Sequence, residues 1–135
     1  MAIDIITLYK DSNLTDAVSE GDMSNPVTAY INGETGGTVE MKLYLKNTSS
    51  EYAITNLTVS VYDTDTTTPI PSGLHIEFAP DNGGVPDTYN TTATLPDVPA
   101  GGNIAFWMKV TVDAGTDIAK ITDLKIKHEG EAYIP

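Results

Sequence analysis

The two histidines are the residues best suited to acid–base or metal chemistry, because the chain contains no cysteine. His75 alternates with Leu74 and Ile76, so its side chain is expected to point outward from its strand. His128 falls at the end of the last expected strand. No motif links either histidine to the serine and aspartate, or to the second histidine, that a catalytic or metal site requires. The sequence therefore predicts neither an enzyme nor a transition-metal site.

Two acidic segments resemble the alternating oxygen ligands of calcium loops. The first contains Asp63 and Asp65 in YDTDTTTP, and the second contains Asp81, Asn82 and Asp87. The first segment lacks the distal glutamate that completes a calcium loop. We interpret both segments as solvated turns in which Asp and Asn cap their own backbone, with a weak surface calcium site as the alternative. No metal and no cofactor is predicted.

Three aromatic residues occupy positions that face away from the core on strongly predicted strands, namely Tyr44, Tyr62 and Trp107. If these strands share a sheet, the three side chains form a contact patch for a protein neighbour or for a sugar ring. Aromatic side chains are enriched in protein interfaces, where they contribute much of the binding energy. The alternative is that an arm formed by residues 1–26 folds back and covers them. These three residues are the candidate interface.

Alternation of apolar and polar residues predicts a series of strands separated by turns rich in Gly, Pro and Asn. The clearest is 104–112, in which every second residue is apolar and Trp107 points away from the core. The other strands are expected at residues 3–9, with Ile3 and Ile5 inward, and at 27–31, 38–46, 54–63, 74–78, 88–95 and 123–128. Residues 79–87 are expected to form a long turn. Residues 10–26 are expected to form a polar loop or arm, in which residues 14–18 could form a short helical turn.

This pattern of seven to nine strands without a convincing helix predicts an all-β fold, a single antiparallel β-sandwich. The strands at 38–46 and 54–63 are expected either to pair or to face each other across the core. An OB-like or jelly-roll strand order is the alternative. The chain shows no linker and no internal repeat, so we expect one domain, a β-sandwich of residues 27–135, which an N-terminal strand and arm of residues 1–26 precede.

The charge balance excludes several classes of partner. The 135 residues carry a formal net charge of −12 and include no arginine. An acidic surface repels nucleic acid and anionic lipid, and arginine is the usual reader of phosphate and bases. No segment reaches membrane-spanning length, and no signal peptide is recognisable. We therefore predict no nucleic-acid partner and no membrane partner, and synthesis in the cytoplasm.

Two segments resemble known proteins. Residues 39–65 contain KLYLKN, a small polar turn and a strand with alternating valine, and residues 95–115 contain a Pro-Ala-Gly-Gly turn followed by FWMKVTV and Ala-Gly. Together they resemble immunoglobulin-like adhesion-type modules, and they are more similar still to small immunoglobulin-like structural proteins of tailed bacteriophages. The resemblance covers residues 25–130 and implies an immunoglobulin-like sandwich on the virion surface. It assigns no catalytic or binding residue.

The resemblance implies a non-enzymatic virion protein, made in the host cytoplasm, that acts as a capsid decoration or cement protein on the outer shell. Its expected partners are the major capsid protein or tail proteins, and it is expected to be a homo-oligomer or bound to a lattice. A tail or baseplate component is the first alternative. A carbohydrate-binding module that stacks sugars on Trp107, Tyr44 and Tyr62 is the second. A small hydrolase, which needs carboxylates in a cleft, is the third.

Overall fold

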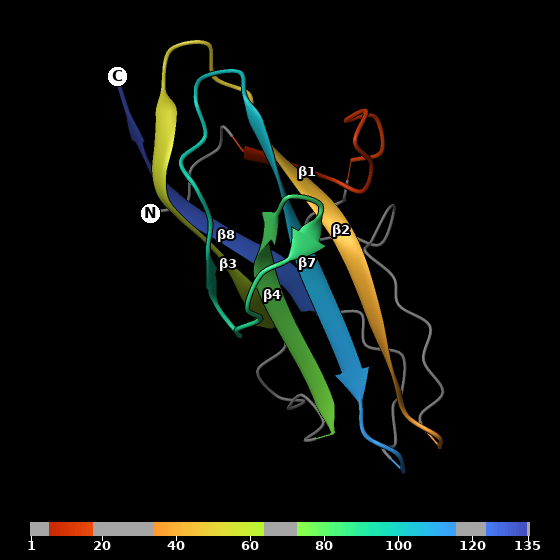
Figure 1. The fold of residues 1–135 in the computed structure, drawn as a ribbon. Coiled ribbons are helices and arrows are strands. Elements are labelled where there is room, and N and C mark those ends of the chain that lie inside the picture. The colour runs from red at the N-terminus through yellow and green to blue at the C-terminus, as the bar shows by residue number, and fades with distance from the viewer. Residues whose placement is uncertain (1–5, 18–33, 64–72, 116–123, 135) are drawn as a thin grey trace.

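The computed structural model describes residues 6–17, 34–63, 73–115 and 124–134, and within these ranges the chain contains strands and no helix. All pairs of neighbouring strands in these ranges are antiparallel (Figure 1). The prediction of an all-β fold is therefore confirmed. The strands are β1 (Ile6–Tyr9), β2 (Gly37–Asn47), β3 (Ala53–Asp63), β4 (Leu74–Asn82), β5 (Val85–Pro86), β6 (Ala93–Thr94), β7 (Asn103–Val112) and β8 (Leu124–Tyr133).

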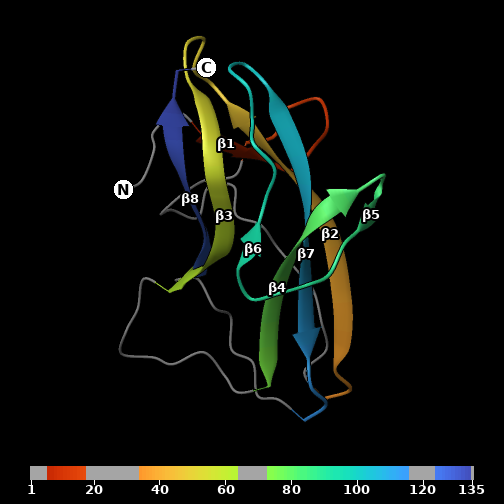
Figure 2. The ribbon, with the colours of Figure 1, turned by 60° about the vertical axis from the view of Figure 1, so that its left-hand side comes forward.

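The strands form two sheets that lie face to face (Figure 2). The larger sheet has the order β1-β2-β7-β4-β5 and the smaller has the order β6-β3-β8. The consecutive strands β2 and β3 therefore belong to different sheets and face each other across the core, which is one of the two predicted arrangements. At the edge of the larger sheet, β1 pairs with the second half of β2.

The hydrophobic core lies between the two sheets and is built from alternate residues of their strands. Phe78 and Phe106 lie at its centre, with ring centroids 6.2 Å apart. Leu43 from the larger sheet and Leu57 from the smaller sheet are also fully enclosed. Each such side chain contributes roughly 1.5–3 kcal/mol when it is removed from water. The alternation predicted for 104–112 is confirmed in β7, where Phe106, Met108, Val110 and Val112 are buried and Ile104 packs against the core.

The segment predicted as a long turn at 79–87 is instead a β-hairpin. β4 continues to Asn82, which pairs with Val85 of β5. Gly83 and Gly84 form the two-residue connection with φ angles of 65° and 96°, as a type I′ turn requires. Pro80 and Asp81 interrupt the apolar alternation, which is why the sequence indicated a turn. In Figure 2 the hairpin projects from the larger sheet, away from the smaller one.

A β-bulge interrupts β3 between Thr55 and Thr58, and Asn56 within it has a positive φ of 52°. A bulge adds one residue to a strand and so reverses which residues face inward. Ile54 and Leu57, three positions apart, are consequently both buried. Strict alternation would place only one of these two residues inward, because it cannot anticipate a bulge.

The two remaining strands also differ from their predicted lengths. β8 extends to Tyr133, beyond the predicted end at His128. The Thr-rich segment 88–95, predicted as one strand, contains only the short strand β6, which lies at the edge of the smaller sheet. The predicted strand at 27–31 lies outside the described residues.

Beyond β1, residues 10–17 form a compact loop rather than a helical turn. The carboxylate of Asp11 closes it by accepting hydrogen bonds from the backbone N–H groups of Thr15 at 3.0 Å and Asp16 at 2.9 Å. The Thr15 hydroxyl and then these backbone donors lower the pKa of Asp11. In β1 itself, Ile6 and Leu8 are buried, whereas Ile3 and Ile5, which were expected to face inward, lie outside the described residues.

Asn47, at the end of β2, is the buried polar residue that joins two turns. Its side chain is 1% exposed. The Nδ2 group donates to the backbone oxygens of Tyr52 at 2.7 Å and Pro99 at 3.2 Å, and Oδ1 accepts from the N–H of Ser49 at 3.0 Å. One amide therefore links the β2–β3 connection to the segment that precedes β7.

Candidate functional site

The outer face of the larger sheet holds two of the three candidate interface residues. Tyr44 on β2 and Trp107 on β7 both point away from the core, as predicted, and both are partly exposed. Tyr9 on β1 lies directly opposite Tyr44 in the ladder and adds a further aromatic ring. We call this surface the aromatic–lysine face and define it by Tyr9, Lys42, Tyr44, Tyr89, Trp107 and Lys109.

Trp107 lies at the base of the projecting hairpin. Its Nε1–H donates to Oδ1 of Asp81 at 2.9 Å. The ammonium group of Lys42 lies 3.8 Å from the same oxygen and 5.9 Å from the ring centroids of both Tyr44 and Trp107. A cation within about 6 Å of a ring face is attracted to it. Lys42 therefore connects the two aromatic rings, and Asp81 fixes both Lys42 and the indole.

Tyr89 extends the face across β4 and β7. Its hydroxyl donates to Oε2 of Glu40 on β2 at 2.7 Å, and the ammonium group of Lys109 lies 4.4 Å from its ring centroid. Lys109 also lies 3.8 Å from Glu77 on β4. Burial, the hydrogen bond to Glu40 and the negative charges of Glu40 and Glu77 raise the pKa of Tyr89. Tyr89 was not among the predicted interface residues, because the hairpin that returns residues 87–90 to the sheet was not predicted.

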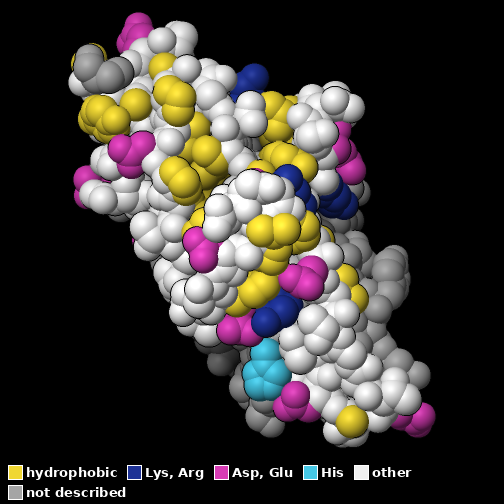
Figure 3. Space-filling view, viewed as in Figure 1, with side chains coloured by type: hydrophobic (Ala, Val, Ile, Leu, Met, Phe, Trp, Pro, Cys, Tyr) yellow, Lys and Arg dark blue, Asp and Glu magenta, His cyan; other side chains and the backbone are white. Residues whose placement is uncertain are grey.

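The charges on this face are balanced, in contrast to the net charge of the chain. Three lysines that point outward from this sheet, Lys42, Lys46 and Lys109, are matched by three carboxylates, Glu40, Glu77 and Asp81, and the pairs Lys42–Asp81 and Lys109–Glu77 are 3.8 Å apart. Figure 3, which looks at this face, shows hydrophobic, basic and acidic side chains interleaved along its middle. A protein that carries −12 overall therefore presents here a surface that repels a neighbouring molecule less strongly.

Tyr62 does not share this face. It lies on β3, which pairs with β6 and β8, whereas β2 and β7 pair with each other in the larger sheet. The condition for a patch of Tyr44, Tyr62 and Trp107 is therefore not met, and only the backbone of Tyr62 is described. Of the segment expected as a covering arm, β1 lies beside β2 at the sheet edge, while residues 18–26 fall outside the described part of the chain.

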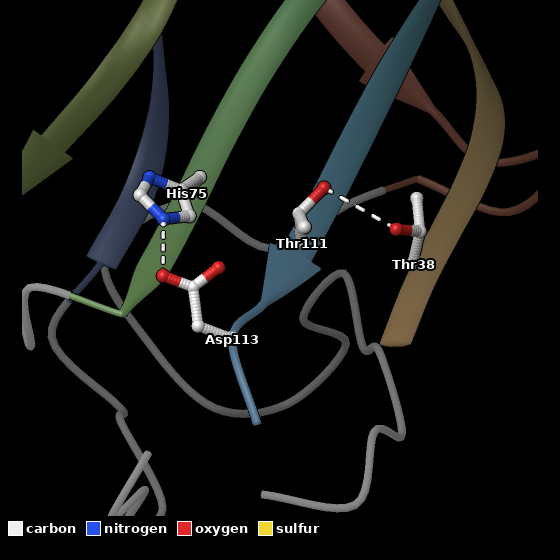
Figure 4. Close-up of polar contacts among 4 residues, drawn as sticks. All are labelled: Thr38, His75, Thr111 and Asp113. Atoms are coloured by element: carbon white, nitrogen blue, oxygen red, sulfur yellow. Dashed lines mark hydrogen bonds and ion pairs between the residues drawn. The ribbon is translucent and has the colours of Figure 1, made fainter. Parts of the chain in front are cut away.

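The histidines lie apart, on β4 and β8 of different sheets. Nε2 of His75 is 3.1 Å from Oδ2 of Asp113, as Figure 4 shows. Thr111 is opposite His75 in the ladder, but its hydroxyl lies 3.5 Å from that of Thr38 and is turned away from the imidazole. The hydroxyl of Thr111 is therefore not aligned with this His–Asp pair as a nucleophile.

The calcium candidates do not form a described site. Asp81 is engaged by Trp107 and Lys42, and Asp87 accepts from the N–H of Thr88 at 2.8 Å, as expected of an aspartate that caps its own backbone. Asp65 and the side chain of Asp63 are outside the described structure. Within residues 6–17, 34–63, 73–115 and 124–134, no group of three or more His, Cys, Asp or Glu is placed to hold a metal ion.

Comparison of the chain with protein-family models, with curated proteins and with solved structures finds no match in any of the three. In the described part of the chain, no helix has the length and apolar character needed to cross a bilayer. The function is therefore inferred from the arrangement of the two sheets and from the aromatic–lysine face.

Proposed function

We propose that the protein is a non-enzymatic structural subunit of a tailed-phage virion, a capsid decoration protein that binds the outer shell through the aromatic–lysine face. The observation that supports this most is the gathering of Tyr9, Tyr44, Tyr89 and Trp107 on one outward sheet face. The core does not use these rings. The proposal includes an immunoglobulin-like strand order for the sandwich, with β2 and β7 paired in one sheet and β3 in the other.

The chemistry of the face suits attachment to another protein. Aromatic rings bury a large area, and the lysines above them carry the polar specificity of an interface. Each contact can be individually weak, because many copies on a regular lattice gain avidity. The strong negative charge elsewhere keeps unbound copies apart before assembly.

Immunogold labelling of purified virions of the source phage tests the location. Label spread over the head supports a decoration protein. Label confined to the tail or its tip replaces decoration with the tail or baseplate alternative, and intact particles without label overturn the virion proposal.

The binding face is tested with purified protein added back to particles that lack it. We expect Trp107→Ala to reduce the bound amount at least about tenfold, the effect of losing an interface residue worth about 1.4 kcal/mol or more. Tyr133→Ala is the matched control, because Tyr133 is an exposed aromatic residue, at 39%, that lies on β8 in the other sheet. Equal binding by both variants would assign attachment to a different surface.

A carbohydrate-binding module is the second candidate, because Tyr44 and Trp107 both lie beside Lys42 on this face, Asp81 accepts from the indole, and a sugar needs both stacking rings and hydroxyl acceptors. Pull-down on cellulose, chitin and peptidoglycan separates the two functions. Retention on one polysaccharide that Trp107→Ala abolishes, without binding to particles, would favour the sugar module.

A further inference from the structure

An open groove lies between the edges of the two sheets and borders the aromatic–lysine face at Glu77. Its volume is about 580 Å³. β3 contributes one wall and the beginning of β4 contributes the other, and two threonines lie beside them. The lining residues are Ser60, Val61, Leu74, His75, Ile76, Glu77, Thr91 and Thr92.

The backbone of β4 is open along this groove. The N–H and C=O of Phe78 bond to Asn90 at 2.7 and 2.8 Å, so both groups point away from β7. In an antiparallel strand, the N–H and C=O groups of the residues two and four positions before Phe78 point in the same direction as those of Phe78. The backbone groups of Ile76 and Leu74 therefore face the groove. Beyond Phe78, β5 pairs only with Asp81 and Asn82, and no described strand pairs with residues 74–77 on this side.

The backbone of β3 is open on the opposite wall. The C=O of Leu57 accepts from the N–H of Leu95 at 2.8 Å, which directs it toward β6. By the same alternation, the N–H and C=O of Val61 point to that side. β6 pairs only with Thr58 and Val59, so the pairing does not extend to Val61. Two sheet edges thus present backbone donors and acceptors to one groove.

The side chains in the groove complete a site for an extended chain. Val61, Leu74 and Ile76 are partly buried and pack against the core while still lining the groove. Recognition by strand addition combines backbone hydrogen bonds with apolar positions for alternate side chains. Open strand edges of this kind readily accept another strand.

We propose that this groove binds an extended segment of another protein, which adds to β4 as a strand along residues 74–77. Its side chains are apolar at alternate positions, and lysine or arginine residues flank it. The charge of −12 attracts such a basic segment and repels a second copy of this chain. This inference does not depend on the proposed virion role, since none of the residues that define the aromatic–lysine face lines the groove.

The experiment uses the synthetic peptide KKVTVTVKK and the full-length ¹⁵N-labelled protein. With saturating peptide, we expect hydrogen exchange at the Ile76 amide to slow by at least about tenfold, because a new strand protects that N–H. A peptide N-methylated at alternate residues keeps the side chains but loses the donors, and we expect it to bind at least about tenfold more weakly. The acid-flanked peptide EEVTVTVEE is also expected to bind more weakly.

Two variants locate the site. Ile76→Pro removes the N–H that faces the groove, and it leaves the hydrogen bonds between β4 and β7 intact. Proline is tolerated where a strand edge is unpaired. We expect it to abolish protection by the peptide. If Ile76→Pro does not fold, Thr92→Lys tests the same point, because it places a cation at an exposed position of the lining.

Trp107→Ala separates this inference from the proposed function, and we expect it to bind the peptide as the wild type does. Absence of binding at millimolar peptide would overturn the inference. So would loss of peptide binding in Trp107→Ala, or an Ile76 amide that is already protected in the free protein, since the groove would then be filled by the chain itself.

Discussion

At the scale of single residues, Asn47 and Tyr89 each join segments that lie far apart along the chain. Asn47 is enclosed and uses its amide to bond the backbone of two turns. Tyr89 is partly exposed and reaches from the segment after β5 to Glu40 on β2. Asn47 is expected to matter for stability, because its buried amide holds the two turns together, and Tyr89 organises the surface proposed to bind.

We expect Asn47→Ala to lower the free energy of unfolding by about 2–3 kcal/mol, because it removes a buried amide that bonds to the carbonyls of Tyr52 and Pro99 and to the N–H of Ser49. Urea unfolding followed by tryptophan fluorescence measures this. Asn103→Ala is the control, because Asn103 is exposed, and it is expected to change stability by less than about 0.5 kcal/mol. Equal effects from the two substitutions would show that the amide is not what joins the turns.

Tyr89 gives the stability a dependence on alkaline pH. Its pKa is raised in the folded state, so the stabilisation is fully present below the ordinary tyrosine pKa of about 10 and is lost as the pH rises above it. We expect the free energy of unfolding to fall more steeply between pH 9 and 11 in the wild type than in Tyr89→Phe. Parallel curves for the two proteins would contradict this. The comparison cancels the titration of the other six tyrosines.

At the scale of elements, the hairpin of β4 and β5 is what assembles the candidate site. It places Asp81 beside Trp107 and returns the chain so that Asn90 bonds to Phe78 and Tyr89 crosses the sheet. Its tip is exposed, with Val85 at 59%. The hairpin therefore forms one border of the aromatic–lysine face, and its turn determines the geometry of that face.

The turn tolerates only certain side chains. Gly84 has a φ of 96° in open space, so Gly84→Val strains the backbone without any steric clash to relieve. We expect it to cost about 1–3 kcal/mol. Gly83→Asn is the matched control, since Asn accepts positive φ at the first position of a type I′ turn, and its effect should be near zero. Thermal unfolding measures both, and equal melting temperatures for the two variants would exclude a type I′ turn.

The sequence predicted the elements that alternation specifies and missed those set by backbone conformation. The alternating strands β2 and β7 were predicted correctly, together with the outward direction of Trp107. The inward Ile54 was missed because the bulge in β3 reverses parity. The hairpin was missed because Pro80 and Asp81 do not alternate.

The candidate site was predicted in part for the same reason. Tyr44 and Trp107 were found from strand parity alone. Tyr62 was included because sequence does not reveal which strands share a sheet. Tyr89 was not found, since its position depends on a hairpin that is formed by two glycines of positive φ. The groove was also missed, because it results from the different lengths of neighbouring strands.

At the scale of the whole molecule, 19 acidic residues and 7 basic residues leave a strong excess of negative charge. Mutual repulsion destabilises the compact state, and dissolved salt screens it within about 8 Å at physiological strength. The ion pairs at Lys42 and Lys109 are partly exposed, and such pairs contribute little. Repulsion should therefore dominate the response of the stability to salt.

We expect the melting temperature to rise between 10 and 300 mM NaCl, by roughly 2–4 °C for each kcal/mol of repulsion that is removed. Differential scanning calorimetry measures the shift. Potassium fluoride serves as the control for chloride-specific binding, and the two salts should act alike. A melting temperature that falls with salt would show that the exposed ion pairs outweigh the repulsion.

The pairing of β2 with β7 has a consequence for synthesis of the chain. Thr38 and Thr111 face each other although 73 positions separate them, so the central ladder of the larger sheet closes only after most of the protein has left the ribosome. Contacts between such distant residues make folding slow. Until β7 emerges, the apolar side of β2 remains exposed in the nascent chain, where chaperones and aggregation compete for it.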